Sequence, residues 1–81
     1  MPSAEEQFQG LREDLQQLIV YLHERGDKTL AMSKRFEEHA RTDPANREFD
    51  QRQATMLDYQ HYVWHEIGNM VEKLVKKYDK A

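Results

Sequence analysis

Apolar residues recur at alternating steps of three and four along the first half of the chain. This spacing is the heptad pattern of helices that pack along one face. The stretch S-A-E-E begins a capping box, in which Ser3 pairs with Glu6 at the third helical position. The pattern predicts a helix over about 3–41. Its expected packing positions are Phe8, Leu11, Leu15, Leu18, Leu22, Thr29, Met32 and Phe36.

A second helix is predicted after a short turn. The turn lies at about 42–45, in the stretch R-T-D-P-A-N-R-E. Thr42 or Asp43 can cap the next helix, and Pro44 suits its first turn. The second helix is expected over about 45–79, and a short connection makes the two helices antiparallel neighbours. Its expected packing positions are Phe49, Met56, Tyr59, Val63, Ile67, Met70 and Leu74.

Gly26 leaves two interpretations of the first helix open. In one, the stretch E-R-G-D-K is a turn in which Gly26 ends a helix and Asp27 caps another. In the other, the helix continues, straight or gently kinked, and the glycine costs roughly 1 kcal/mol relative to alanine. The apolar pattern passes from Leu22 to Thr29 without a change of phase, which favours the continuous helix.

A second apolar stripe follows the predicted second helix, about 80–100° around its axis from the first stripe. One partner helix cannot cover so wide an arc. We therefore expect an all-α antiparallel hairpin, a single domain over 1–81, that pairs into a dimeric four-helix bundle or binds a different protein. Tryptophan and tyrosine are typical anchors of such interfaces. The expected partner-binding residues are Leu57, Tyr62, Trp64, Val71 and Val75.

The composition narrows the function classes. Of 81 residues, 38% are hydrophobic and 33% are charged, which suits long helices with narrow apolar stripes. The net charge of −3 and the absence of a basic block argue against nucleic acid as the main partner. The chain has no cysteine, which excludes disulfides and thiolate metal sites. Without an apolar run long enough for a membrane or a signal peptide, we expect a cytoplasmic protein and no membrane partner.

Two histidines offer the one candidate for metal chemistry. His61 and His65 share a helical face, with Asp58 one turn earlier, and this H-x-x-x-H spacing occurs in helix-borne zinc sites. The stretch H-Y-V-W-H lacks the glutamate that follows the first histidine in catalytic zinc helices. We interpret these histidines as solvated, and keep the three residues as the alternative metal ligands. No nucleophile elbow, phosphate loop or pair of buried carboxylates is present, so we expect no enzyme and no cofactor.

Three family resemblances accompany this pattern. In outline the chain resembles the WXG-type secreted hairpins of type VII secretion, which pair as four-helix bundles. It departs from them because its tryptophan, Trp64, lies within a helix and not in the turn. In size and shape it is similar to small helical-hairpin chaperones of type III secretion.

The stretches L-R-E-D-L, E-R-G-D-K and D-P-A-N-R-E resemble the N-terminal region of all-helical chorismate mutases, although the third helix is missing. In that family arginines, a lysine and a glutamate line the substrate site. We expect a non-enzymatic protein–protein interaction module, such as an adaptor, inhibitor, chaperone or regulator. The alternatives are a secretion-system hairpin or its chaperone, and a metal-binding bundle that uses His61 and His65.

Overall fold

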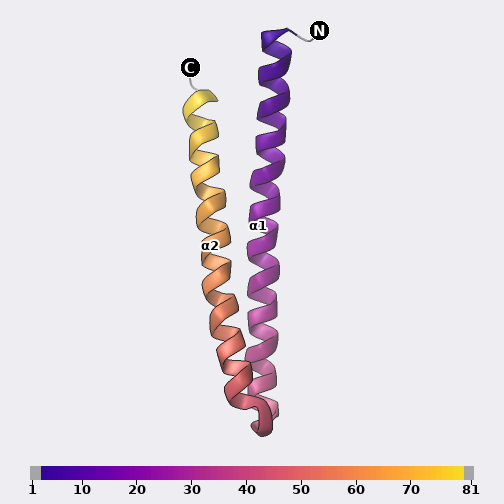
Figure 1. Cartoon of the computed structure of the whole chain (residues 1–81), viewed down its shortest axis with the longest axis vertical. Coiled ribbons are helices and arrows are strands. Elements are labelled where there is room, and N and C mark those ends of the chain that lie inside the picture. The colour runs from indigo at the N-terminus through magenta and orange to yellow at the C-terminus, as the bar shows by residue number, and fades with distance from the viewer. Residues whose placement is uncertain (1–2, 80–81) are drawn as a thin grey trace.

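The computed structural model describes residues 3–79 and consists of two long helices side by side (Figure 1). Helix α1 spans Ala4–Thr42 and helix α2 spans Arg47–Asp79, joined by the short 3-10 helix η1, Pro44–Asn46. The helices run antiparallel in a rod that measures 62 × 23 × 12 Å. The expected all-α hairpin is confirmed. The expected unit over 1–81 includes residues 1, 2, 80 and 81, which lie outside the described residues.

The start of α1 follows from its capping residue. The Ser3 backbone is extended, and its Oγ accepts a hydrogen bond from the Glu6 backbone N–H at 3.2 Å. This bond satisfies one of the amides that a helix start leaves without a partner. Beyond it, α1 continues for 39 residues and passes through Gly26 without a break. The alternative in which Gly26 ends a helix is therefore wrong.

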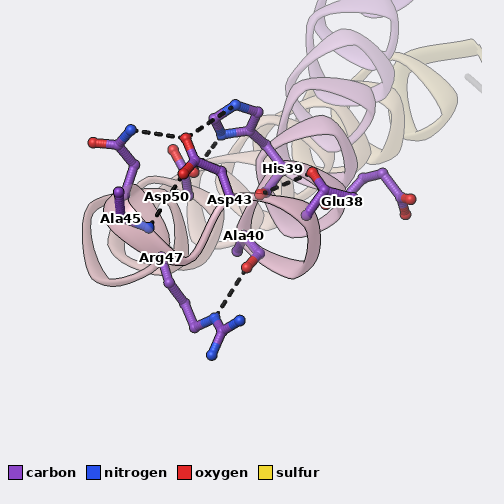
Figure 2. A network of polar contacts seen from close by, with 9 residues as sticks. Glu38, His39, Ala40, Asp43, Ala45, Arg47 and Asp50 are labelled. Carbon is purple, nitrogen blue, oxygen red and sulfur yellow. Dashed lines mark hydrogen bonds and ion pairs between the residues drawn. The ribbon is translucent and has the colours of Figure 1, made fainter.

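The turn is held by side chains that satisfy the two helix ends (Figure 2). Asp43 accepts hydrogen bonds from the Asn46 side-chain amide at 2.8 Å and from the Ala45 backbone N–H at 3.2 Å. These bonds, the one from Asn46 first, lower the pKa of the Asp43 carboxyl below its ordinary value. Arg47 Nε donates to the Ala40 carbonyl at 3.1 Å. The Ala40 carbonyl near the end of α1 and the Ala45 amide after it thus find side-chain partners within the turn.

A histidine and a buried carboxylate join the two helices beside the turn (Figure 2). His39 on α1 lies with its Nδ1 2.5 Å from Oδ2 of Asp50 on α2. Only 3% of Asp50 is exposed, so its side chain needs a hydrogen-bond partner within the protein. The hydrogen bond to Asp50, and then the carboxylate's charge, raise the pKa of His39 above its ordinary value. The pair therefore fixes the register of the hairpin at its closed end.

The residues between the helices follow one unbroken heptad spacing on each helix. They are buried or half-buried positions, separated by alternating steps of four and three residues. On α1 they are Leu15, Ile19, Leu22, Gly26, Thr29, Ser33, Phe36 and Ala40. On α2 they are Asp50, Ala54, Leu57, His61, Trp64, Gly68, Val71 and Val75.

Over much of the hairpin's length, small residues recur among these inward positions. Gly26, Ser33 and Ala40 on α1 meet a helix that carries Ala54 and Gly68, and all five are buried. Small side chains let two helix axes approach closely. The buried Ser33 Oγ donates to the Ala54 carbonyl across the seam at 2.7 Å. The core of the hairpin is therefore close-packed, but it buries little apolar volume.

Candidate functional site

The structure corrects the face assigned to the tryptophan stripe. Leu57 and Val75 are 8% and 7% exposed and pack against α1. Trp64 and Val71 are half-buried in the same series, whereas Tyr62 is 63% exposed. The sequence pattern predicts that this stripe faces outward, toward a partner, and that orientation is wrong for the four buried and half-buried residues. Binding of a partner by these residues stays a prediction, because the structure contains one chain.

The orientation predicted for α2 is wrong because the residues that face α1 are not the most apolar ones on the helix. The most continuous apolar series on α2 contains Met56, Val63, Ile67, Met70 and Leu74, and we expected it to face α1. These side chains are between 38% and 59% exposed. The inward series instead mixes glycine, alanine, histidine and aspartate with its apolar residues, so average apolarity does not identify it. Close approach and specific hydrogen bonds decide the packing here.

Turning α2 in this way leaves a long apolar surface on the outside of the hairpin, which we call the outer apolar face. On both helices its members recur at seven-residue intervals, next to the inward series. Exposed apolar patches beyond a few hundred Å² are unusual on a monomer and mark interaction sites. The outer apolar face comprises Leu11, Leu18 and Met32 from α1 with Phe49, Met56, Val63, Ile67, Met70 and Leu74 from α2.

A groove at the open end of the hairpin shows that the exposed apolar residues of the two helices lie on the same side of the hairpin. Leu11 and Leu18 of α1 and Leu74 of α2 line it together. Its volume is about 550 Å³, and its floor includes the inward residues Leu15 and Val71. The apolar arc of each helix is therefore wider than a two-helix seam requires. An arc of this width is typical of helices in a four-helix bundle.

Trp64 has a cationic neighbour at the border between the seam and the outer apolar face. The Arg25 guanidinium carbon lies 5.6 Å from the centre of the Trp64 ring. This distance is within the range of a cation–π contact. Arg25 occupies the α1 position between Leu18 and Met32 in the seven-residue series. The indole is thus covered from α1, which explains why it is half-buried in a hairpin with a narrow core.

The candidate metal ligands on α2 do not converge. His61 Nδ1 lies 3.0 Å from the Asp58 carbonyl oxygen and 3.4 Å from Oδ1 of the same residue, so its contacts are local. The rings of His61 and His65 meet edge to face with centroids 5.3 Å apart. Within residues 3–79, no group of three or more histidine or carboxylate side chains is placed to hold a metal ion. The alternative based on these three residues therefore gains no support.

His65 has a different partner, which the sequence analysis missed. Its Nδ1 lies 3.0 Å from Nδ1 of His23 on α1, and the two rings are tilted with centroids 5.2 Å apart. A signal was present, because H-E-R-G at 23–26 and H-E-I-G at 65–68 repeat one motif in the two halves of the chain. In an antiparallel hairpin with its turn midway between them, the two copies lie opposite each other.

Neither helix, over the part of the chain that the structure describes, has a segment apolar enough to cross a lipid bilayer. Comparisons of the chain with protein-family models, with curated proteins and with solved structures found no match. The resemblances to secretion hairpins, secretion chaperones and chorismate mutases stay predictions, as does the cytoplasmic location. The outer apolar face and the two histidine contacts are the features that a functional proposal has to explain.

Proposed function

We propose that this chain is a non-enzymatic protein–protein interaction module that pairs with a second copy of itself through the outer apolar face. The pair forms a four-helix bundle and acts as an adaptor, inhibitor, chaperone or regulator. The observation that carries the proposal is the seven-residue series of half-exposed leucine, isoleucine, valine, methionine and phenylalanine along both helices. A contiguous apolar surface of this kind is typical of a site where another protein packs.

The amount of apolar surface favours a second copy as the partner. Full burial of a large apolar side chain contributes about 1.5–3 kcal/mol, so covering the exposed half contributes on the order of 1 kcal/mol. Two copies of the outer apolar face then supply on the order of 10–20 kcal/mol. Association costs roughly 4–15 kcal/mol in lost freedom of motion. A second copy also carries the same seven-residue spacing, so its side chains match the holes of the first.

One leucine and one valine on the same turn of α1 provide a matched test of the proposed dimer surface. Leu18 belongs to the outer apolar face and is 41% exposed, whereas Val20 is 56% exposed and lies outside that face. We expect the purified protein to be a dimer at micromolar concentration. We expect Leu18→Lys and Ile67→Lys to be monomers that keep their helicity, and Val20→Lys to stay a dimer. Molar mass is measured by light scattering over a concentration series, with circular dichroism for helicity.

Two outcomes would contradict the proposal. A monomeric wild type over the whole concentration range would remove the second copy as the partner. A dimeric Leu18→Lys variant, or equal weakening by Val20→Lys, would show that the dimer uses another surface.

A further inference from the structure

Two histidine rings meet across the middle of the hairpin, each beside a glycine of the opposite helix. A Cβ atom at Gly26 would lie 2.7 Å from Cδ2 and Nε2 of His65. A Cβ atom at Gly68 would lie 3.2 Å from Nε2 of His23. A larger residue at either glycine would displace the ring that lies against it. The repeated H-E-x-G motif thus determines where the two rings can lie.

The contact between the two rings is a hydrogen bond that depends on their protonation. Nδ1 of His23 lies 3.0 Å from Nδ1 of His65. A neutral imidazole has a hydrogen on one nitrogen and a lone pair on the other, whereas both nitrogens of a charged imidazolium are donors. The bond therefore needs one Nδ1 with a hydrogen and one without. When both rings are charged, two N–H groups and two positive charges face each other at this distance.

Carboxylates at the outer ring nitrogens favour one positive charge on the pair. Nε2 of His65 is 3.3 Å from Oδ1 of Asp27, and Nε2 of His23 is 4.0 Å from Oε2 of Glu72. Each carboxylate favours a hydrogen on the nitrogen that faces it. A single further hydrogen between the inner nitrogens completes the hydrogen bond. Glu72 also pairs with Lys76, whose Nζ lies 3.2 Å from Oε1, so it compensates the charge on the pair only in part.

The next charged and titratable groups around the pair come from both helices. The ring of His61 meets that of His65 edge to face with centroids 5.3 Å apart, and its Nδ1 lies 3.4 Å from Oδ1 of Asp58. Arg25 lies over the ring of Trp64, the residue before His65. His61 and Arg25 are both cationic in acid, so they oppose a second positive charge on the pair.

We propose that His23 and His65 form a pH-sensitive latch, which is closed while one inner nitrogen is unprotonated and opens when acid protonates both rings. About 30% of each side chain is exposed, so protons from water reach the pair. Ordinary histidines change charge between about pH 8 and pH 5, and the latch operates within that range. Opening separates the helices where Gly26 and Gly68 bring them close.

A second histidine contact between the helices responds to acid in the opposite direction. His39 is hydrogen-bonded to the buried carboxylate of Asp50, and a positive charge on the imidazole strengthens that bond. Acid therefore holds the turn while it opens the middle of the hairpin. The hairpin then separates from its open end, where the start of α1 and the end of α2 lie (Figure 1). Inward apolar residues on that side of the latch, such as Ile19 and Val71, become exposed.

Nitrogen NMR of the full-length protein with isotope-labelled histidine observes the latch directly. We expect the Nδ1 atoms of His23 and His65 to carry one hydrogen between them at about pH 7, and one hydrogen each at about pH 5. Two unprotonated Nδ1 atoms at about pH 7 would overturn the proposal, because the rings would then share no hydrogen bond.

Amide hydrogen exchange measures the opening of the hairpin. After correction for the intrinsic effect of pH on exchange, protection at Gly26 and Gly68 should fall about tenfold between about pH 7 and pH 5. Protection at Ala40, beside the turn, should not fall. Unchanged protection at the two glycines would overturn the proposal. An equal loss at Ala40 would also overturn it, because the whole hairpin would then unfold in acid.

Glutamine variants separate the latch from other titrating groups. Glutamine has a donor and an acceptor but no proton to gain, so His23→Gln and His65→Gln should each remove the pH dependence of protection at Gly26. His39→Gln is the matched control, because its histidine lies beside the turn, and it should keep that dependence. Persistence of the pH dependence in both latch variants, or its loss in His39→Gln alone, would contradict the proposal.

The latch does not depend on dimer formation. Leu18 and His23 are five residues apart, about 140° around α1, so they lie on opposite edges of the seam. The Leu18→Lys variant should therefore lose protection at the two glycines over the same pH range as the wild type. Loss of the pH dependence in that variant would show that a second copy takes part, and would contradict a latch built from one hairpin.

Discussion

Substitution of the two glycines of α1 at positions 10 and 26 tests how closely the helices approach each other. Alanine is favoured over glycine within a helix by about 1 kcal/mol. No atom lies within 4 Å of a Cβ placed at Gly10, so Gly10→Ala should stabilise the protein by about 0.5–1 kcal/mol. At Gly26 the same preference is opposed by the His65 ring, 2.7 Å from the new carbon.

The opposing cost at Gly26 can be estimated from the contacts that must change. Moving the ring breaks the 3.0 Å contact with His23, and a lost hydrogen bond costs about 0.5–1.5 kcal/mol. Holding the ring away from a preferred rotamer costs a similar amount, about 0.5–1.5 kcal/mol. The helix preference therefore offsets only part of the cost. We expect Gly26→Ala to lie between neutral and about 2 kcal/mol less stable than wild type.

Thermal unfolding followed by far-UV circular dichroism separates the two variants. A difference of about 1 kcal/mol corresponds to about 4–8 °C in Tm for a chain of this size. The protein concentration is held fixed, because a dimer's Tm depends on it. In a His65→Ala background the ring is absent, and Gly26→Ala should then stabilise as Gly10→Ala does. Equal stabilisation by both substitutions in the wild-type background would refute the close approach of α1 to the His65 ring.

Two further predictions concern His39 and Trp64. Because the folded pKa of His39 is raised above its ordinary value of 6.5, its contribution to stability is full below that pH and is lost as pH rises through the folded pKa. His39→Gln should therefore flatten the fall in stability above about pH 6.5 in urea titrations, and an unchanged pH profile would contradict the ion pair with Asp50. Trp64→Ala should lower hairpin stability by at most about 3 kcal/mol, because the indole is only half-buried. Loss of association in Trp64→Ala without loss of stability would instead support the outward orientation of the tryptophan stripe.

The ends of the helices could be predicted from the sequence because local chemistry determines them. Ser3 accepts a hydrogen bond from the Glu6 N–H and Asp43 accepts one from the Ala45 N–H, so no distant contact is needed at these helix starts. The passage of α1 through Gly26 could also be anticipated from the uninterrupted phase of the apolar residues. Propensity and spacing are sufficient for these features.

The orientation of the helices about their own axes could not be predicted in this way. Two adjacent stripes on α2 are both apolar enough to face α1, and their difference in hydrophobicity favours the one that is exposed in the structure. Contacts between residues far apart in sequence decide between them, namely Ser33 with Ala54 and His39 with Asp50. Small and polar residues at the inward positions determine which face of α2 packs against α1. A count of apolar residues does not include them.

The same limit explains the missed histidine pair. Spacing patterns relate a histidine to ligands on its own helix, whereas His23 and His65 lie on different helices, 42 residues apart in sequence. The repeated H-E-x-G motif would have linked them once the hairpin was assumed. Equal spacing of a motif on either side of a turn is therefore a useful signal in antiparallel hairpins.

The unbroken alternation of four and three from Leu15 to Ala40 has a consequence for the shape of any partner surface. An ideal α-helix drifts by about 20° per seven residues relative to a strict heptad repeat, so the helices keep their contact only by winding around each other in a left-handed supercoil. The outer apolar face has the same period and must wind with it. A straight or right-handed bundle would drift away from this face over a few heptads. The hairpin can therefore discriminate among partners by the handedness of their coiling before any single side chain is compared.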